Sequence, residues 1–209
     1  MTIAAAVIGD VHGEAGRLAE LISILPGRRL VFVGDLVNRG PDTRLVLDTV
    51  ARLAAAGSAV LIAGNHERAL LSYWRGEKSF VEFALMGGLA TLKSYLPEAR
   101  GDVWAQFRTV FPEGHRALLE GALDEFWLGD ALVRHWHADA EIALATKIGS
   151  STQGRPLVVG HTVVNQAKRI GDVVLLDSGC GTSGGALSAF LWPEQTFVST
   201  AGDSASGTD

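Results

Sequence analysis

Five short segments of the sequence carry residue types that bind metal ions or transfer protons. In chain order they are GDVHG (residues 9–13), GDLVNRG (34–40), GNHE (64–67), HADA (137–140) and GHT (160–162). Together they can deliver two aspartates, one asparagine and four histidines to one place. Loops beyond the carboxyl ends of strands converge on one crevice in open α/β sheets. We therefore predict one metal site built from segments that are far apart in the chain.

The spacing and the residue types favour two ions. Asp10 and His12 are two residues apart, so on an extended segment their side chains point the same way and can bind one ion. Asp35 has two carboxylate oxygens and can bridge to a second ion, whose other ligands would be Asn65, His137 and His161. Because these donors are oxygen and imidazole without thiolate, they suit Mn, Fe or Zn better than Cu(I) or an iron–sulfur cluster.

The charge balance of such a site indicates a phosphate substrate. Two divalent cations outweigh two carboxylates, which leaves positive charge for a hydroxide and a phosphate oxygen. Paired ions about 3.5–4 Å apart activate one water and clamp the attacking and leaving oxygens. Arg39 can bind further phosphate oxygens with its planar guanidinium. His66 follows Asn65 and should point away from it, which makes it a candidate general acid for the leaving oxygen.

Short apolar runs rich in Val, Ile and Leu predict the strands that position these segments. The first runs cover residues 3–8, 30–33 and 59–63, and another covers 156–159. Helical patterns at 15–25 and 42–56 separate the first three strands, and Pro41 and Gly57 stand where a helix enters and exits. This order predicts an α/β fold with a parallel sheet and crossover helices.

The rest of the chain is predicted to belong to the same domain, which we place at residues 1–198. A mostly helical excursion should cover about 66–123, with strands following at 131–136, 157–159, 173–176 and 186–191. The Gly-rich loop 179–185 lacks the lysine of a P-loop, so we expect it to be a hairpin connection. Residues 199–209 have almost no apolar content and are expected to be a disordered tail.

Composition excludes several classes of protein. The net charge of -5 argues against binding nucleic acid or an anionic membrane surface, because both require clustered Lys and Arg. No stretch reaches the roughly 18 apolar residues of a membrane span, and no signal peptide is recognisable. Cys180 is the only cysteine, so an internal disulfide is impossible. We expect a cytoplasmic protein.

Taken in order, the five segments resemble the signature of calcineurin-like metallophosphoesterases. The likeness is to the phosphoprotein phosphatase superfamily and its bacterial and phage Ser/Thr phosphatase-like members. It covers nearly the whole chain, because GG with TLKSY (residues 87–95) and the closing DSG and GG also resemble bacterial members. The resemblance implies a four-layer α-β-β-α sandwich and two divalent ions, commonly Mn, with Fe or Zn as alternatives.

The resemblance also implies a role for each matching residue. The first ion would be held by Asp10, His12 and Asp35, and the second by Asp35, Asn65, His137 and His161. Arg39 would bind phosphate and His66 would be the acid.

Some residues keep two interpretations. His135 and His137 share a face if the strand at 131–136 continues, so either could be the ligand, and His137 fits the family motif better. Arg68 can bind phosphate or can be solvated, and we favour the second. Cys180 is not needed as a nucleophile beside a metal-activated hydroxide, and His115 is expected on a helix surface.

Asn38 departs from the family pattern, which usually has an aspartate there to support the acid. An aspartate would stabilise the protonated ring of His66 and raise its pKa. We expect Asn38 to accept the ring N–H through its carbonyl, which orients His66 without adding charge. Without a neighbouring negative charge, His66 should help an aryl oxide or a phosphoanhydride to leave more easily than a serine alkoxide.

Three functions remain after this reasoning. The first is a metal-dependent phosphomonoesterase that resembles bacterial Ser/Thr protein phosphatases and acts through a dinuclear-metal-activated hydroxide. The alternative is a dinucleoside-polyphosphate hydrolase of the diadenosine-tetraphosphate type. The third is a scaffold that has kept the fold and lost catalysis. The partner is accordingly a phosphoprotein, an aryl phosphate or a nucleotide.

Overall fold

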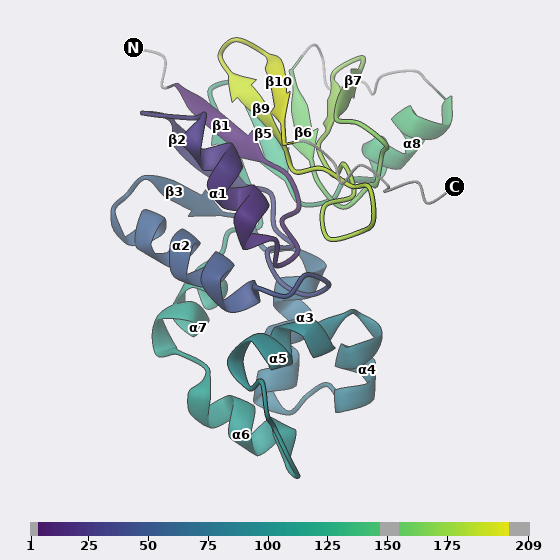
Figure 1. The fold of residues 1–209 in the computed structure, drawn as a ribbon. Helices are drawn as coiled ribbons and strands as arrows, with labels where there is room; N and C mark the ends of the chain where they lie inside the picture. The colour runs from purple at the N-terminus through teal and green to yellow at the C-terminus, as the bar shows by residue number, and fades with distance from the viewer. Residues whose placement is uncertain (1–3, 147–154, 201–209) are drawn as a thin grey trace, which may run out of the picture.

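Two β-sheets stacked face to face, with helices outside them, form the body of the protein (Figure 1). The structure is a computed structural model and describes residues 4–146 and 155–200. Within these residues each sheet has five strands. The first sheet runs in the order β10, β9, β1, β2, β3, formed by Thr196–Ser199, Ser188–Trp192, Ala5–Ile8, Arg29–Phe32 and Ala59–Leu61. The second runs in the order β4, β5, β6, β8, β7, formed by Glu125–Leu128, Ala131–Arg134, Leu157–Val159, Val173–Leu175 and Lys168–Ile170.

Both sheets combine parallel and antiparallel pairs. Strands β1, β2 and β3 are parallel neighbours, as the strand and helix order predicts, whereas β9 and β10 add antiparallel strands at one edge. In the second sheet β5, β6 and β8 are parallel. The parallel strands of each sheet therefore release their loops at the same edge.

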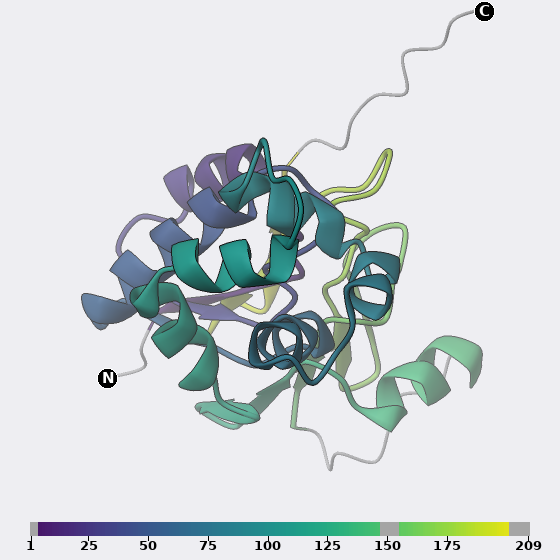
Figure 2. The ribbon, with the colours of Figure 1, turned by 90° about the horizontal axis from the view of Figure 1, so that it is seen from below.

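Alternation along the strands separates the layers. In β1, Ala6 and Ile8 pack with helices α1 (Ala15–Ser23) and α2 (Thr43–Ala55). Ala5 and Val7 point the other way, into a core shared with the second sheet. The outer face of the second sheet packs against α8 (Ala138–Thr146), which lies on the opposite side of the molecule from α1 and α2 (Figure 2). The four-layer α-β-β-α sandwich is confirmed.

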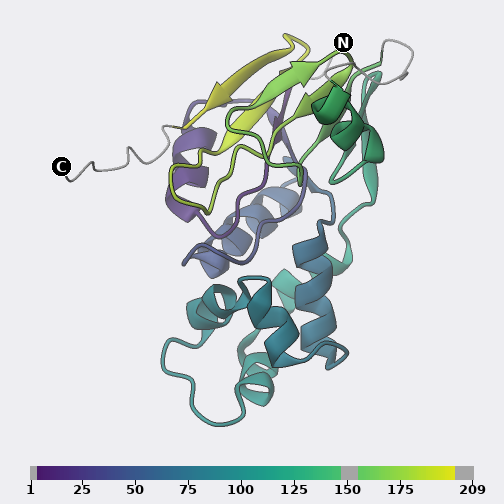
Figure 3. The same cartoon turned by 90° about the vertical axis from the view of Figure 1, so that its right-hand side faces the viewer.

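The helical excursion lies below the sandwich (Figure 3) and consists of five helices. They are α3 (Asn65–Arg75), α4 (Phe80–Leu85), α5 (Gly88–Tyr95), α6 (Val103–Val110) and α7 (Glu113–Glu120). Tyr73 stacks on Phe83 with ring centroids 4.9 Å apart, and Phe107 completes this buried cluster. The cluster joins the core that lies under α1 and α2, so the excursion is packed against the sandwich.

Three of the expectations from the sequence were wrong. The Gly-rich loop is no hairpin connection, because it joins β8 in one sheet to β9 in the other. Ser199 belongs to β10, and Thr200 donates its backbone N–H to Leu187 O at 2.9 Å, so the expected tail does not begin at residue 199. Residues 201–209 lie outside the described part. His115 is buried, where it contacts Tyr95 and Asp48.

Among the helices of the described residues, none combines the length and the apolar character needed to cross a membrane.

Candidate metal centre

Loops from both sheets meet at the edge where the parallel strands end. The first sheet contributes the residues after β1, β2 and β3, and the second contributes those after β5 and β6. Their side chains form two groups of potential ligands that share Asp35, namely His12 with His66 and His135 with His161. The site therefore lies across the interface between the two sheets, and Asp35 stands at its middle.

The first group contains an unpartnered ring nitrogen. His12 donates its Nδ1 proton to Val37 O at 3.0 Å, which leaves the lone pair on Nε2. This Nε2 is buried, has no hydrogen-bond partner among the described residues and lies 3.9 Å from Asp35 Oδ2. Burial and then the charge of Arg39 lower the pKa of His12 to about 3, so its imidazole is neutral. A neutral nitrogen aimed at a carboxylate fits a metal ligand.

The second group brings acceptor atoms together. His135 donates Nδ1–H to Val33 O at 3.0 Å, so its Nε2 also carries a lone pair. That Nε2 lies 2.9 Å from Asn65 Oδ1 and 3.5 Å from Asp35 Oδ1. Burial lowers the pKa of His135 to about 4. His161 Nδ1 is 3.0 Å from the same Asn65 oxygen. The lone pairs of His135 Nε2 and Asn65 Oδ1 face and repel each other, and a cation between them is the group that would satisfy both.

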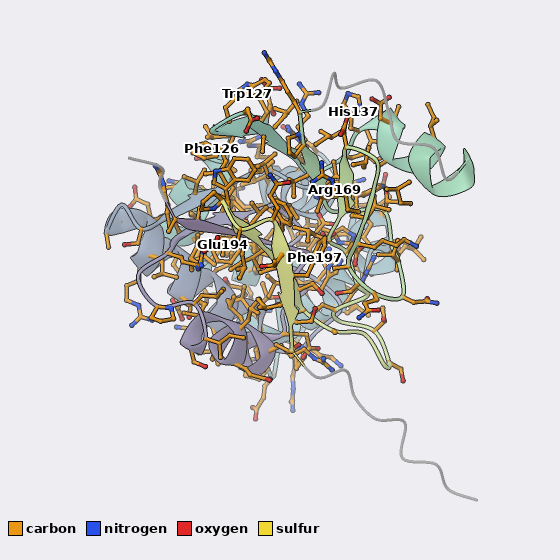
Figure 4. All side chains as sticks on the ribbon, turned by 90° about the horizontal axis from the view of Figure 1, so that it is seen from above. Phe126, Trp127, His137, Arg169, Glu194 and Phe197 are labelled. Atoms are coloured by element: carbon orange, nitrogen blue, oxygen red, sulfur yellow. The ribbon has the colours of Figure 1, made fainter. Side chains whose placement is uncertain are left out.

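We predicted His137 as a metal ligand, but the structure does not bring it into either group of potential ligands. Strand β5 ends at Arg134, and the next residue, His135, still faces the first sheet. His137 lies just before α8 (Figure 4), its side chain is about one-third exposed, and its Nδ1 accepts the N–H of Asp139 at 3.2 Å. His135 takes the place that we assigned to His137, because the strand ends earlier than the sequence pattern suggests.

Buried carboxylates surround the two groups. Burial raises the pKa of Asp35 to about 7. It also raises the pKa of Asp10 well above its usual value, with further contributions from the charges of Asp177 and Asp35. Asp10 accepts the backbone N–H of His161 at 3.2 Å, which ties the two sheets together. Such crowding of negative charge is unfavourable without cations, and it fits a site for divalent metal ions.

Two of these acids were missed by sequence reasoning. Asp177 is buried, follows the apolar run of β8, and its pKa is raised by burial. Glu67 is also buried, and it accepts the N–H groups of Asp35 at 2.7 Å, Leu36 at 2.8 Å and Gly64 at 2.9 Å. Glu67 therefore fixes the loop that carries Asp35, whose φ of 51° is uncommon for a residue other than glycine. The position of Asp177 at a strand end was the available signal.

Asn38 contacts the candidate acid His66 through its amide nitrogen, whereas we expected its carbonyl oxygen to make the contact. Its Nδ2 lies 2.8 Å from His66 Nδ1, and its Oδ1 accepts the hydroxyl proton of Thr91 at 2.8 Å. Thr43 Oγ1 lies 3.0 Å from that hydroxyl, and the backbone N–H of Asn38 also donates to it at 2.9 Å. The amide therefore donates to His66 Nδ1, and the ring proton sits on Nε2, 3.7 Å from Asp35 Oδ2.

Replacing Thr91 with valine should test this arrangement. The buried Asn38 N–H would lose its acceptor, so we expect a loss of about 1–3 kcal/mol in unfolding free energy. The amide would also be free to turn its oxygen to His66, and kcat should fall roughly ten-fold with little change in KM. Thr91→Ser keeps the hydroxyl and should restore both quantities. Chemical denaturation and steady-state kinetics measure them, and a Thr91→Ser protein as impaired as Thr91→Val would contradict the prediction.

The two arginines lie in different settings. Arg39 is exposed, its N–H donates to Gly87 O at 3.1 Å, and its charge contributes to the lowered pKa of both His12 and His66. It therefore adjoins the centre, as expected from the turn. Arg68 is largely exposed and its Nη2 lies 2.6 Å from Asp124 Oδ1. Its binding of phosphate stays a prediction.

Comparison with known proteins gives one family. Residues 3–166 match the calcineurin-like phosphoesterases. A protein named asymmetrical bis(5'-nucleosyl)-tetraphosphatase PrpE from Halalkalibacterium halodurans is 31% identical, over 92% of each chain. Its namesake from Geobacillus thermodenitrificans is 30% identical over the same shares. The solved metallophosphoesterase from Sphaerobacter thermophilus has a TM-score of 0.58 at 19% identity, covering 96% of this chain and 89% of its own, and so shares the fold. The chain belongs to the calcineurin-like phosphoesterase family and is a hydrolase that acts on phosphate ester bonds.

Proposed function

We propose that the protein hydrolyses dinucleoside polyphosphates at a phosphoanhydride bond. The observation that carries the proposal is the contact of Asn38 Nδ2 with His66 Nδ1 at 2.8 Å, which gives the acid no negative charge. A phosphoanhydride departs with little help from an acid, whereas a serine alkoxide needs it. The names of relatives that match over 92% of the chain support this alternative more than the phosphomonoesterase that the sequence put first.

Two divalent cations, with Mn as the first choice and Fe or Zn as alternatives, complete the proposed site. One would be held by Asp10, His12 and Asp35, and the other by Asp35, Asn65, His135 and His161. Bound there, they would supply an activated water and positive charge for the phosphate oxygens.

The chain's own polar groups would position the substrate and the leaving oxygen. Arg39 offers a planar cation beside the centre for phosphate oxygens. Burial and the charge of Arg39 lower the pKa of His66 to about 4, so the ring is neutral near pH 7. Its Nε2 proton would then stabilise the leaving oxygen as a hydrogen-bond donor.

A substrate panel on the Mn-reconstituted protein tests the proposal. Diadenosine tetraphosphate and p-nitrophenyl phosphate should each give a higher kcat/KM than a phosphoserine peptide, with the dinucleotide highest. A phosphoserine value equal to or above the other two would contradict the proposal. Zero turnover of every substrate with Mn and with Zn would favour the scaffold instead.

Replacing Asn38 with aspartate should shift the pH dependence. The new carboxylate, 2.8 Å from Nδ1 in the present geometry, would raise the pKa of His66, because it stabilises the protonated ring. The ring, which loses its second proton above a pKa of about 4 in the unchanged chain, would then stay protonated to higher pH and could protonate the leaving oxygen, so the basic limb of the kcat profile should move upward. Phosphoserine turnover should gain most. An unchanged profile would show that Asn38 does not set the strength of the acid.

A further inference from the structure

A cavity of about 300 Å³ opens directly beside the candidate metal centre. Asn65 and His135 form its inner wall, so they belong to both the cavity and the centre. The other lining residues are Ala63, Arg68, Asp124, Arg134 and Trp136. None of these five belongs to either group of potential metal ligands, although the cavity and the centre share two residues.

The walls of this cavity suit a flat heterocycle. Trp136 is 47% exposed, and its indole N–H donates to Glu141 Oε1 at 3.0 Å, which holds the ring in place. Arg68 and Arg134 add planar guanidinium groups, oriented by ion pairs to Asp124 at 2.6 Å and Glu125 at 2.8 Å. An aromatic face and planar cations bind nucleobases by stacking whatever the base sequence. The carboxylate of Asp124 adds an acceptor for ribose hydroxyls or base amino groups.

We propose that this cavity binds one nucleoside of the substrate, with its base against Trp136. The proposal rests on the proposed function and adds the position of cleavage. Because Asn65 and His135 wall the cavity, a nucleoside held there brings the first phosphate of its chain to the centre. A longer phosphate spacer would push the nucleoside out of the cavity. Hydrolysis therefore takes place at the α-phosphorus of the bound nucleotide.

The bond that forms and the bond that breaks determine the products. The oxygen of water forms a bond to the α-phosphorus, and the bond from that phosphorus to the oxygen shared with the β-phosphorus breaks. The shared oxygen keeps the electron pair and leaves with the other nucleotide, and protons from water are released to solvent. Diadenosine tetraphosphate then yields adenosine monophosphate, which carries the oxygen of water, and adenosine triphosphate.

Hydrolysis of diadenosine tetraphosphate in H₂¹⁸O by the Mn-loaded protein tests the position of attack without any substitution. Mass spectrometry should find ¹⁸O in the monophosphate. Label in the triphosphate would place the β-phosphorus at the centre and overturn the inference, and two diphosphates as products would do the same. In each of these cases the proposed function would stand, because a dinucleotide was still hydrolysed.

A binding measurement tests the cavity itself. Adenosine monophosphate titrated into the Mn-loaded protein by calorimetry should bind at least ten-fold more weakly to Trp136→Ala than to the unchanged chain. Trp127 lies on β4 and is 49% exposed (Figure 4). It does not line the cavity, so Trp127→Ala is the matched control and should bind as the unchanged chain does. Equal affinities for both variants would overturn the inference, as would an unchanged chain that binds no monophosphate. This readout needs no turnover, so it remains decisive if the substrate panel fails.

Discussion

The Asp35→Asn protein is expected to lose at least about 10³-fold in kcat/KM on every substrate while its metal-free form becomes more stable. Asp35 is the carboxylate that both ligand groups share, with Oδ2 3.7 Å from His66 and 3.9 Å from His12, and Oδ1 3.5 Å from His135. Residues that only orient metal ligands cost 10–100-fold when changed, so loss of the shared ligand should cost more. The amide keeps the shape of the carboxylate and removes its charge.

The gain in stability follows from the raised pKa of Asp35, which burial brings to about 7. The unfolded chain ionises this carboxyl at lower pH than the folded chain does. The metal-free native state therefore loses stability as pH rises from the unfolded value toward about 7, and that loss persists above it. Asparagine has no such charge to bury, while its carbonyl can still accept the N–H of His66 that Asp35 Oδ1 accepts at 3.0 Å.

Chelator-treated protein unfolded by urea at pH 8, with metal content and kcat/KM measured separately, checks both halves of this prediction. Asp130 is exposed in a turn, so Asp130→Asn is the control that should change neither quantity. An active Asp35→Asn protein would show that the site does not need the Asp35 carboxylate. A variant that is inactive and also less stable without metal would show that Asp35 supports the loop rather than the ions.

The second large effect distinguishes between His135 and His137 as the metal ligand. Replacing His135 with alanine removes a buried nitrogen 2.9 Å from Asn65 Oδ1, so we expect one metal equivalent to be lost and kcat/KM to fall by at least about 10²-fold. Replacing His137 with alanine removes only a contact with Asp139 in which both side chains are about one-third exposed, and both quantities should change by less than about three-fold.

Elemental analysis after Mn loading and steady-state kinetics on p-nitrophenyl phosphate measure the two variants side by side. The assignment of His135 would be wrong if His137→Ala carried the loss and His135→Ala kept two ions. Both residues lie beyond the end of β5, so neither substitution changes a residue of that strand.

Much of the fold could be predicted because short sequence patterns mark the strands and helices of its parallel core. The runs that became β1, β2 and β3 are apolar on both faces, and the helices between them have a clear helical period. Strands β4, β7 and β10 were not predicted. Their residues are mostly half-exposed or exposed, and β7 is only Lys168–Ile170, so no apolar run marks them.

The errors at the site depend on contacts between distant segments. His135 and His137 share one face by the strand period, and only the end of β5 decides between them. The donor sense of Asn38 is set by Thr91, which stands 53 positions away in the sequence. Glu67 acts on residues 31 and 32 positions away. Residue types and their order therefore predicted which side chains gather, whereas their hydrogen-bond partners depend on packing.

The proposed ligands are divided between the two sheets, and this division would couple metal binding to the folding equilibrium. Asp10 and Asp35 follow strands of the first sheet, and His135 and His161 follow strands of the second. Ions that bind only when the sheets are stacked add their binding free energy to that of folding, about 2.7 kcal/mol at a free concentration one hundred times Kd. The stability of the stacked sheets would then rise with the free concentration of divalent ions, and the melting temperature would report how much metal the chain has bound.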